Sequence, residues 1–456
     1  MTFFTNARIP TMQSNKTVNV DILVENGKII SLGKNIKVGE GIRIVDLHEM
    51  LVLPGGIDPH VHFNTPGFEE RETFEAGSAF AATGGITTVI DMPCTSWPPV
   101  TNVANLENKL KAIRGQSHVD YALWGGVSGN CLNEPDWQEN MRALWNAGVV
   151  GFKTYALSGM PTFTHLTPDE IKTVVEFAGS IGALVGHHAE AAEIVQPVMA
   201  ILMAEGRIDP AAYALSRPTE AEVVAIQRIG ELAKKSGTPL HIVHVSSGRG
   251  AELISEFKSQ GVAITGETCP HYLAFSVDDL IAKGSVLKTA PVVKTKADSE
   301  KLWQALATGE LDFIASDHAP CPPEQKQTGS IWSDYGGISG TGTLLPFLYS
   351  EGFRKGNLTL AQLVAVTSNN AARRFGLFPR KGALQVGSDA DFVCINESRN
   401  TMIHGADFPS RGKLTPFEGF EFQGKIQAVY LRGNFVYNDV NGLAGERSGQ
   451  FIKRNH

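Results

Sequence analysis

The chain has 456 residues, of which 42% are hydrophobic, and a formal net charge of −7. This length suits two or three average domains, or one large α/β barrel with an accessory domain. The negative charge and the lack of a Lys/Arg run argue against a nucleic-acid partner. No apolar run approaches the ~20 residues that a membrane span requires, so no membrane partner is expected.

The first residues show no basic region followed by an apolar core and a cleavage site. Five cysteines are scattered along the chain, and no Cys-x-x-Cys pair occurs. This pattern indicates neither a disulfide framework nor a thiolate zinc site. The sequence therefore predicts a cytoplasmic protein.

The N-terminal segment has the pattern of short strands. Val18–Val24 and Lys28–Leu32 flank Asn26-Gly27, which is a strong hairpin signal, and Ile42–Asp46 is a further strand candidate. A segment this short is too small to bury a core of its own comfortably, so it should pack against another part of the chain.

From Leu53 onward, short apolar runs rich in β-formers alternate with stretches of helical period, such as Thr73–Thr83 and Thr219–Lys235. Eight such units over ~300 residues predict a (β/α)8 barrel. A doubly wound open sheet is the alternative, but no Gly-x-Gly-x-x-Gly follows an early strand. The eight expected strands are Leu51–Ile57, Ile86–Ile90, Tyr121–Val127, Val149–Tyr155, Ala183–His187, Leu240–Val245, Val262–Thr265 and Asp312–Ala315.

Strand character returns near the C-terminus, in Gly382–Ile395 and Ile426–Tyr437. The simplest packing joins both chain ends into one small β-domain. The predicted fold is therefore α/β, with a TIM-type (β/α)8 barrel at 54–380. Residues 1–53 and 381–456 are expected to form a small β-sandwich domain beside it.

Active sites of such barrels lie at the C-terminal ends of the strands, and metal-capable side chains occur at those places. The first strand ends in His60 and His62, which point the same way because side chains alternate along a strand. Two such imidazoles can share one metal ion, although an isolated His-x-His is as often structural. The other strand ends carry Lys153, His187-His188, His241 with His244, and Asp317-His318.

Lys153 stands within an otherwise apolar strand. A buried ammonium is costly, and neighbouring divalent cations would repel it. A neutral amine can react with carbon dioxide to give a carbamate, an anion able to bridge two metal ions. The alternative is a lysine paired with an acidic neighbour, but the surrounding histidines favour the carbamate.

The histidines at the fifth and sixth strand ends differ in how well their positions are defined. His187 and His188 are adjacent, so at most one should face the barrel axis, and the spacing does not choose between them. His244 is nearer its strand end than His241 and is the better ligand. Two further histidines are candidates for supporting or substrate-orienting roles, His271 and His318.

Asp317 can act as both metal ligand and proton carrier. In such sites the nucleophile is a metal-bridging hydroxide whose pKa is lowered toward neutrality. A carboxylate beside it can take the proton on attack and deliver it to the leaving nitrogen. This combination predicts hydrolysis of an amide.

The motifs taken together resemble the cyclic amidohydrolases of the amidohydrolase superfamily, which include allantoinases, dihydroorotases and hydantoinases. The resemblance covers essentially the whole chain. It rests on Pro54–His62, Gly84–Thr88, Gly151–Lys153, His244–Ser247, Glu267–Tyr272 and Ser316–Cys321.

This resemblance implies two divalent metal ions per subunit, with zinc favoured and Fe, Co, Mn or Ni also suited to such ligands. It also implies a homotetramer or homodimer, and CO2 as the source of the lysine modification. Asp317 matches the metal ligand that serves as acid/base. The other matching residues are His60 and His62 for one ion, carboxylated Lys153 for the bridge, and His188 and His244 for the second ion.

Within the family, the motifs favour an allantoinase, which opens allantoin to allantoate. Dihydroorotases carry an Arg two residues after the second histidine and an Asn after Met-Pro, where this chain has Asn64 and Cys94. Hydantoinases usually have Met-Ala-Tyr after the bridging lysine, where Ala156–Gly159 stands here. The substrate-binding residues that the resemblance implies are Thr289, Gly337, His318 and Asn64.

Three hypotheses follow. The first is an allantoinase acting on a small cyclic amide, and the second is a hydantoinase, dihydropyrimidinase or dihydroorotase-like enzyme. The third is a non-catalytic homologue with a scaffold role, which should have lost metal ligands. All six expected ligands are present, so the sequence favours an enzyme.

Overall fold

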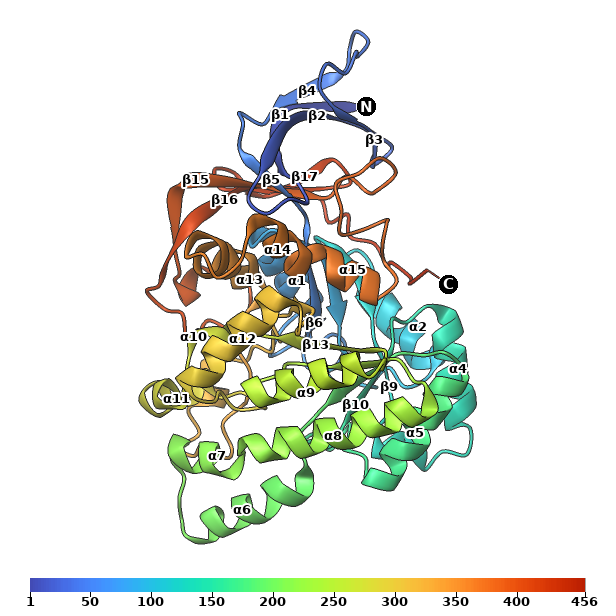
Figure 1. Ribbon diagram of the computed structural model, residues 1–456, viewed down its shortest axis with the longest axis vertical. Helices are drawn as coiled ribbons and strands as arrows, with labels where there is room; N and C mark the ends of the chain where they lie inside the picture. The colour runs from blue at the N-terminus through green and yellow to red at the C-terminus, as the bar shows by residue number, and fades with distance from the viewer. Residues whose placement is uncertain (456) are drawn as a thin grey trace.

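The computed structural model describes residues 1–455, and parallel strands form a closed barrel at its centre (Figure 1). Neighbouring strands pair from β6 to β8 and from β9 to β14, with β8 and β9 as two parts of one interrupted strand. The barrel closes where the backbone N–H of His62 donates to the carbonyl of His318 at 2.8 Å. The strands are β6 (Gly56–Val61), β7 (Ile86–Asp91), β8 (Asp120–Leu123), β9 (Gly125–Gly126), β10 (Phe152–Tyr155), β11 (Val185–His188), β12 (Leu240–Ile242), β13 (Ile264–Thr268) and β14 (Phe313–Ile314). The predicted (β/α)8 barrel is therefore confirmed.

Helices follow the barrel strands and cover the outside of the barrel. Apolar side chains such as Val174 in α5 and Ile226 in α8 belong to one buried cluster with the strands. No helix within residues 1–455 has both the length and the apolar character to cross a membrane. The α-helices are α1 (Phe74–Thr83), α2 (Val103–Ala112), α3 (Gly129–Leu132), α4 (Trp137–Ala147), α5 (Pro168–Ser180), α6 (Ala192–Ala204), α7 (Pro210–Ser216), α8 (Thr219–Ser236), α9 (Gly248–Ser259), α10 (Pro270–Ala274), α11 (Val277–Lys283), α12 (Lys296–Thr308), α13 (Thr341–Phe347), α14 (Leu360–Val364) and α15 (Asn370–Arg374).

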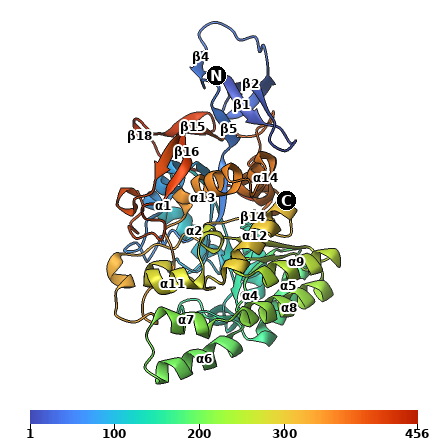
Figure 2. The ribbon, with the colours of Figure 1, turned by 60° about the vertical axis from the view of Figure 1, so that its left-hand side comes forward.

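Strands from both chain ends form one mixed sheet at one end of the molecule (Figure 2). Its order is β18-β17-β16-β15-β5-β1-β2-β3, and β4 pairs with β1. Because β15 pairs antiparallel with β5, the expected union of the two termini is confirmed. The division of the chain at residues 53 and 380 stays a prediction. The strands are β1 (Thr2–Pro10), β2 (Thr17–Glu25), β3 (Lys28–Gly33), β4 (Arg43–Asp46), β5 (Leu51–Pro54), β15 (Phe392–Met402), β16 (Glu421–Leu431), β17 (Asn434–Asn438) and β18 (Gly442–Leu443).

The run Leu51–Ile57, expected as one strand, belongs to two sheets. Its first half is β5 in the terminal sheet, and the chain enters the barrel as β6 from Gly56. At Gly55 a Cβ would lie 2.1 Å from the hydroxyl of Thr87, so only glycine allows this close approach. The backbone N–H of Gly55 donates to the carbonyl of Asp391 at 2.9 Å, which ties the crossing point to the terminal sheet.

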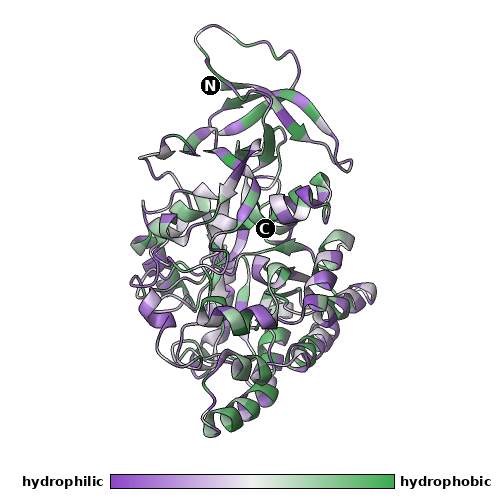
Figure 3. Cartoon of the chain, turned by 90° about the vertical axis from the view of Figure 1, so that its left-hand side faces the viewer, coloured by the Kyte–Doolittle hydropathy of each residue, from purple (hydrophilic) through white to green (hydrophobic). Residues whose placement is uncertain are grey.

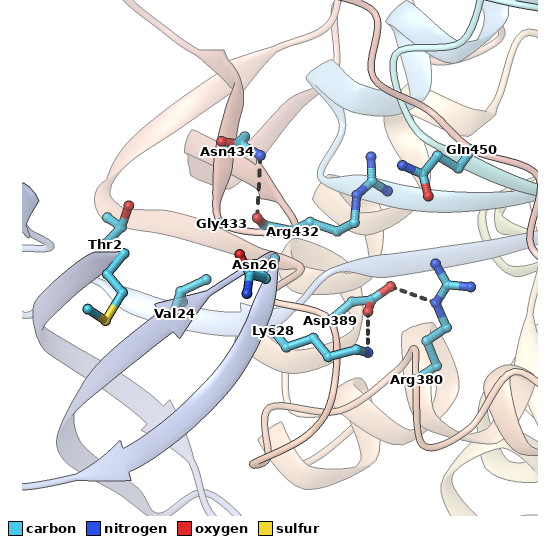
Figure 4. A pocket seen from close by; sticks show the side chains of 12 residues that line it. Thr2, Val24, Asn26, Lys28, Arg380, Asp389, Arg432, Gly433, Asn434 and Gln450 are labelled. Carbon is cyan, nitrogen blue, oxygen red and sulfur yellow. Dashed lines mark hydrogen bonds and ion pairs between the residues drawn. The ribbon is translucent and has the colours of Figure 1, made fainter.

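A buried ion cluster joins the barrel to the C-terminal segment. The ammonium of Lys381 lies 2.5 Å from Asp120, 2.9 Å from Asp389 and 2.6 Å from Asp391. Asp120 begins β8, so this lysine connects the start of a barrel strand to the chain that leads into β15. Beside the cluster, a cleft of about 720 Å³ opens, where Asp389 also pairs with Lys28 and Arg380 (Figure 4).

We expect Lys381→Met to lower the free energy of unfolding by about 3–5 kcal/mol, because three buried carboxylates lose their shared cation. Denaturant titration measures this value. Lys355→Met is the matched control, since Lys355 pairs with Glu351 at a surface position, with its side chain 56% exposed. That control should cost at most about 1 kcal/mol. Equal losses in the two variants would contradict a structural role for the cluster.

Candidate metal centre

His60 in β6, His62 directly after β6 and Asp317 beyond β14 meet at the same end of the barrel. The Nε2 atoms of His60 and His62 each lie 3.3 Å from Oδ1 of Asp317. The three side chains are buried, and one potential ligand atom from each lies within 4.8 Å of the others. The predicted common direction of His60 and His62 is therefore confirmed, and the two rings form a candidate ligand set with Asp317.

Two further imidazoles extend this group. Nδ1 of His188, at the end of β11, lies 3.0 Å from Nε2 of His244, which follows β12. The ring centroids of His244 and His60 are 5.3 Å apart, so the two pairs of rings form one continuous cluster. We refer to these four imidazoles with Asp317 and Lys153 as the imidazole cluster.

Lys153 lies on β10, and its side chain is fully buried. Its Nζ atom has no hydrogen-bond partner and lies 4.7 Å from the ring centroid of Tyr155. Burial lowers the pKa of Lys153 to about 8, opposed by the charges of acidic neighbours such as Asp317. A buried amine without a partner is costly, so the surroundings of Lys153 suit a modified or liganded nitrogen better than a free ammonium.

The backbone at two strand ends turns the ligand side chains into the cluster. His244 and Asp317 have φ values of +40° and +48°, a left-handed conformation that L-residues rarely adopt. Strain of this kind concentrates at functional sites, where the surrounding structure holds it in place. This turn explains how His244 reaches His188, although β12 itself ends at Ile242.

Three polar side chains hold the outer nitrogens of the cluster. Oε1 of Glu267 lies 2.7 Å from Nδ1 of His60, and the hydroxyl of Thr95 lies 3.1 Å from Nδ1 of His62. Oε2 of Glu190 lies 3.1 Å from Nε2 of His188. Such partners fix the tautomer and orientation of metal-binding imidazoles.

No sequence pattern predicted a role for Glu190, Glu267 or Thr95. Glu190 is also paired with Arg217 at 2.5 Å. Glu267 stands next to an expected strand end, inside the Glu267–Tyr272 motif that supported the family resemblance, and Glu190 stands two residues after His188. Their position was the available signal, but only the folded chain reveals which ring each one contacts.

Three other histidines lie outside the cluster. His187 faces Thr154, with Nδ1 2.8 Å from its hydroxyl, so of the two adjacent histidines only His188 joins the cluster. His241 stacks on the ring of Phe313 at 5.1 Å, as expected for a structural residue. His271 is buried, and its Nε2 has no hydrogen-bond partner.

The side chains predicted to bind substrate have different surroundings. The buried hydroxyl of Thr289 and Oδ1 of Asn64 have no hydrogen-bond partner. Nδ2 of Asn64 donates to the carbonyl of His62 at 3.0 Å, so Asn64 lies against the cluster. At Gly337 the φ value is +146° and a Cβ would lie 2.2 Å from the carbonyl of Ala319, which explains the glycine.

His318 does not face the cluster. Its Nε2 lies 3.3 Å from Glu72, its Nδ1 accepts from the backbone N–H of Gly340 at 3.1 Å, and its ring packs on Phe63. Both ring nitrogens of His318 are therefore engaged away from the imidazole cluster, and a substrate-binding role for this side chain stays a prediction. The residue contributes through its carbonyl, which closes the barrel.

The charge balance of the cluster suits cation binding. Burial would raise the pKa of Asp317, but the imidazoles of His60, His62 and His244 hold it well below its usual range. An ionised carboxylate, four imidazoles and a partnerless amine in one buried region are the donors that divalent transition metals prefer. The side chains present therefore fit a divalent metal site.

Comparison with known proteins agrees with this arrangement. A model of the amidohydrolase family matches residues 51–436. An allantoinase of Rubrobacter xylanophilus is 36% identical, covering 95% of this chain and 94% of the relative. An L-hydantoinase of Paenarthrobacter aurescens is 35% identical, covering 97% and 96%. The solved structure of an L-hydantoinase (dihydropyrimidinase) from Arthrobacter aurescens superimposes with a TM-score of 0.94 at 33% identity, covering 99% of each chain.

A barrel with clustered imidazoles at one end, matched over most of its length by these relatives, defines a hydrolase of known type. The chain belongs to the amidohydrolase family, and the expected resemblance is confirmed. Enzymes of this family bind divalent metals, and the imidazole cluster supplies candidate ligands in this chain.

Proposed function

We propose that the protein hydrolyses a cyclic amide and that allantoin is its substrate, opened to allantoate. The observation that carries the proposal is the imidazole cluster, with a partnerless buried lysine at its side. Several of the most similar curated relatives are allantoinases, at 33–37% identity over at least 95% of this chain. These similarities support allantoin as the substrate, and the imidazole cluster supports the hydrolysis of a cyclic amide as the reaction.

The contacts support an assignment of the metal ligands. His60, His62 and Asp317 would hold one ion, and His188 with His244 would hold the second. Lys153, as the carbamate formed with CO2, would lie between them. Zinc is the preferred ion, and Fe, Co, Mn and Ni also suit this donor set. Bound there, the ions would supply a water of lowered pKa and a polarised ring carbonyl.

Asp317 carries the proton. When water adds to the ring carbonyl carbon, the carboxylate of Asp317 accepts a proton, and the C–N bond then breaks. Asp317 returns that proton to the ring nitrogen as it leaves, so the carboxylate is regenerated. Asn64, Thr289 and the backbone at Gly337 are the groups that we assign to ring binding.

A dihydroorotase is less well supported than an allantoinase. A substrate carboxylate needs a cationic or amide partner at the positions of Asn64 and Cys94. Asn64 donates its amide to the carbonyl of His62 instead. Cys94 lies 3.3 Å from the hydroxyl of Tyr155 and brings no cation. A hydantoinase is the second candidate, supported by the L-hydantoinase structure with a TM-score of 0.94.

A substrate panel tests this proposal. Purified, metal-loaded protein is assayed for ring opening of allantoin, hydantoin, dihydrouracil and dihydroorotate. The highest kcat/KM is expected for allantoin, and little or no opening for dihydroorotate. A preference for hydantoin or dihydrouracil would show that allantoin is not the substrate, while the proposed hydrolysis of a cyclic amide would still hold. No hydrolysis of any of the four would overturn the proposal and favour a scaffold role.

We also propose that the chain self-associates through α6 and α7. These helices contact each other, and α6 contains a single charged residue, Glu193 (Figure 3). Four apolar side chains that are 50–59% exposed form what we call the α6 patch: Ile201, Met203, Ile208 and Leu215. Exposed apolar residues gathered over neighbouring elements mark interaction sites. A second copy of the chain, docked through the same surface, would bury the α6 patches of both copies.

Ile201→Asp combined with Met203→Asp should reduce the molar mass measured by light scattering, because charges would have to be buried in the contact. Val386→Asp is the matched control, since Val386 is 61% exposed away from these helices, and its mass should equal that of the wild type. An unchanged mass in the α6 double variant would exclude this surface as the contact.

A further inference from the structure

Glu267 is a buried carboxylate that contacts three parts of the imidazole cluster and its surroundings. It lies near the C-terminal end of β13 and is 1% exposed. Its Oε1 is 2.7 Å from Nδ1 of His60 and accepts from the backbone N–H of His244 at 3.4 Å. Its Oε2 is 3.2 Å from Nε2 of His241. One side chain thus connects His60 of β6 with the backbone of His244, just after β12.

The contact with His60 determines where the proton of that ring lies. Oε1 of Glu267 accepts from the backbone N–H of His244, so it also acts as the acceptor toward Nδ1 of His60, which then carries the hydrogen. Nε2 of His60 is then left with a free lone pair, directed at Oδ1 of Asp317 at 3.3 Å. Two lone pairs facing each other at this distance repel, and a cation between them removes the repulsion. Glu267 therefore prepares the His60 ring for a metal ion.

The other half of the cluster is supported differently. Glu190 holds His188 in the corresponding way, but it also forms an ion pair with Arg217 at 2.5 Å. Within residues 1–455, no Lys or Arg forms an ion pair with Glu267. The charge of Glu190 is thus largely offset by Arg217, whereas no Lys or Arg ion pair offsets that of Glu267 in the described residues. Such a partner raises the basicity of the ligand nitrogen.

We infer that Glu267 is a positioning residue that sets the His60 tautomer and selectively strengthens binding of the ion on the His60 side. This inference rests on the proposed metal centre. It predicts that loss of the Glu267 charge weakens the binding of one ion, on the His60 side. The affinity for the ion that His188 and His244 would hold should change little.

Stepwise zinc titration of chelator-treated protein tests the inference. In Glu267→Gln, which keeps the size and removes the charge, the dissociation constant of one ion should rise about 10- to 100-fold. The second constant should stay near its wild-type value. Glu222→Gln is the matched control, because Glu222 is also buried but binds the hydroxyls of Ser246 and Ser247 and no ring. Both constants should be unchanged in that variant.

Nitrogen NMR of the metal-free wild type provides a second measurement that does not depend on whether Glu267→Gln folds. With ¹⁵N-labelled histidine, the His60 ring should show hydrogen at Nδ1 and none at Nε2, and the signal is assigned by its loss in His60→Asn. Hydrogen at Nε2 would overturn the inference. So would Glu267→Gln protein that binds both ions as tightly as the wild type, whatever its activity.

These outcomes are distinct from failure of the proposed function. If the wild-type protein binds two zinc ions but opens no cyclic amide, the proposed reaction is wrong, and the inferred role of Glu267 still stands. Conversely, if Glu267→Gln is active and binds both ions with wild-type dissociation constants, the positioning role is wrong, and the proposed reaction still stands.

Discussion

Lys153→Ala should abolish most of the ring-opening activity and release part of the bound metal. The side chain is the only lysine of the imidazole cluster, and its Nζ has no other partner in the described part of the chain. Removing the group that we propose to lie between two ions should cost more than the roughly 100-fold that loss of an outer hydrogen-bond partner costs. Steady-state kinetics and elemental analysis of the same sample measure both effects.

Chemical rescue gives this prediction its specificity. A short-chain carboxylate such as acetate or propionate can occupy the space left by the lysine and supply the missing anion, so part of the activity should return. Lys326→Ala is the control for loss of a buried amine, because Lys326 bonds to the carbonyl of Ser285 at 2.8 Å outside the cluster. No carboxylate rescue is expected there. Electron density showing an unmodified ammonium at Lys153, remote from the imidazoles, would refute the bridging role.

The parts of the site that sequence predicts are those governed by short-range periodicity. His60 and His62 share a direction because a strand repeats every two residues, and both reach Asp317 as that period requires. The general position of the site follows from the barrel rule, which places functional side chains at the C-terminal strand ends. These inferences need only the local chain and the fold class.

The parts that sequence did not predict depend on contacts between distant segments. Gly55 carries the chain from one sheet to another, and nothing local distinguishes that change from a continuous strand. His318 directly follows the candidate ligand Asp317, yet its ring turns to Glu72, which lies 246 residues away in sequence. Glu267 reaches His60 across 207 residues. Long-range hydrogen bonds of this kind have no periodic signal in a single sequence.

Asp317→Asn should retain bound metal and lose turnover, and this is the second large effect that we expect. Asparagine keeps the shape of the side chain and an oxygen 3.3 Å from His60 and His62, so the ion on that side still has a ligand. An amide cannot accept the proton of the attacking water. The fall in kcat should be about 100- to 10,000-fold, the range that a positioned acid or base contributes.

Metal content measured on the assayed sample separates this effect from loss of a ligand, because a fall in kcat at full metal occupancy points to proton transfer. Asp58→Asn is the matched control: Asp58 is also buried near the barrel end, but it accepts from Ser316 at 3.0 Å and contacts no ring of the cluster. Asp58→Asn should lower the free energy of unfolding but have little effect on the kcat of the folded protein. Unchanged kcat in Asp317→Asn would remove the acid/base role, since the same carboxylate cannot both carry the proton in each turnover and be dispensable. A loss of kcat together with a loss of metal would instead assign Asp317 to ion binding alone, and another group would then have to protonate the leaving nitrogen.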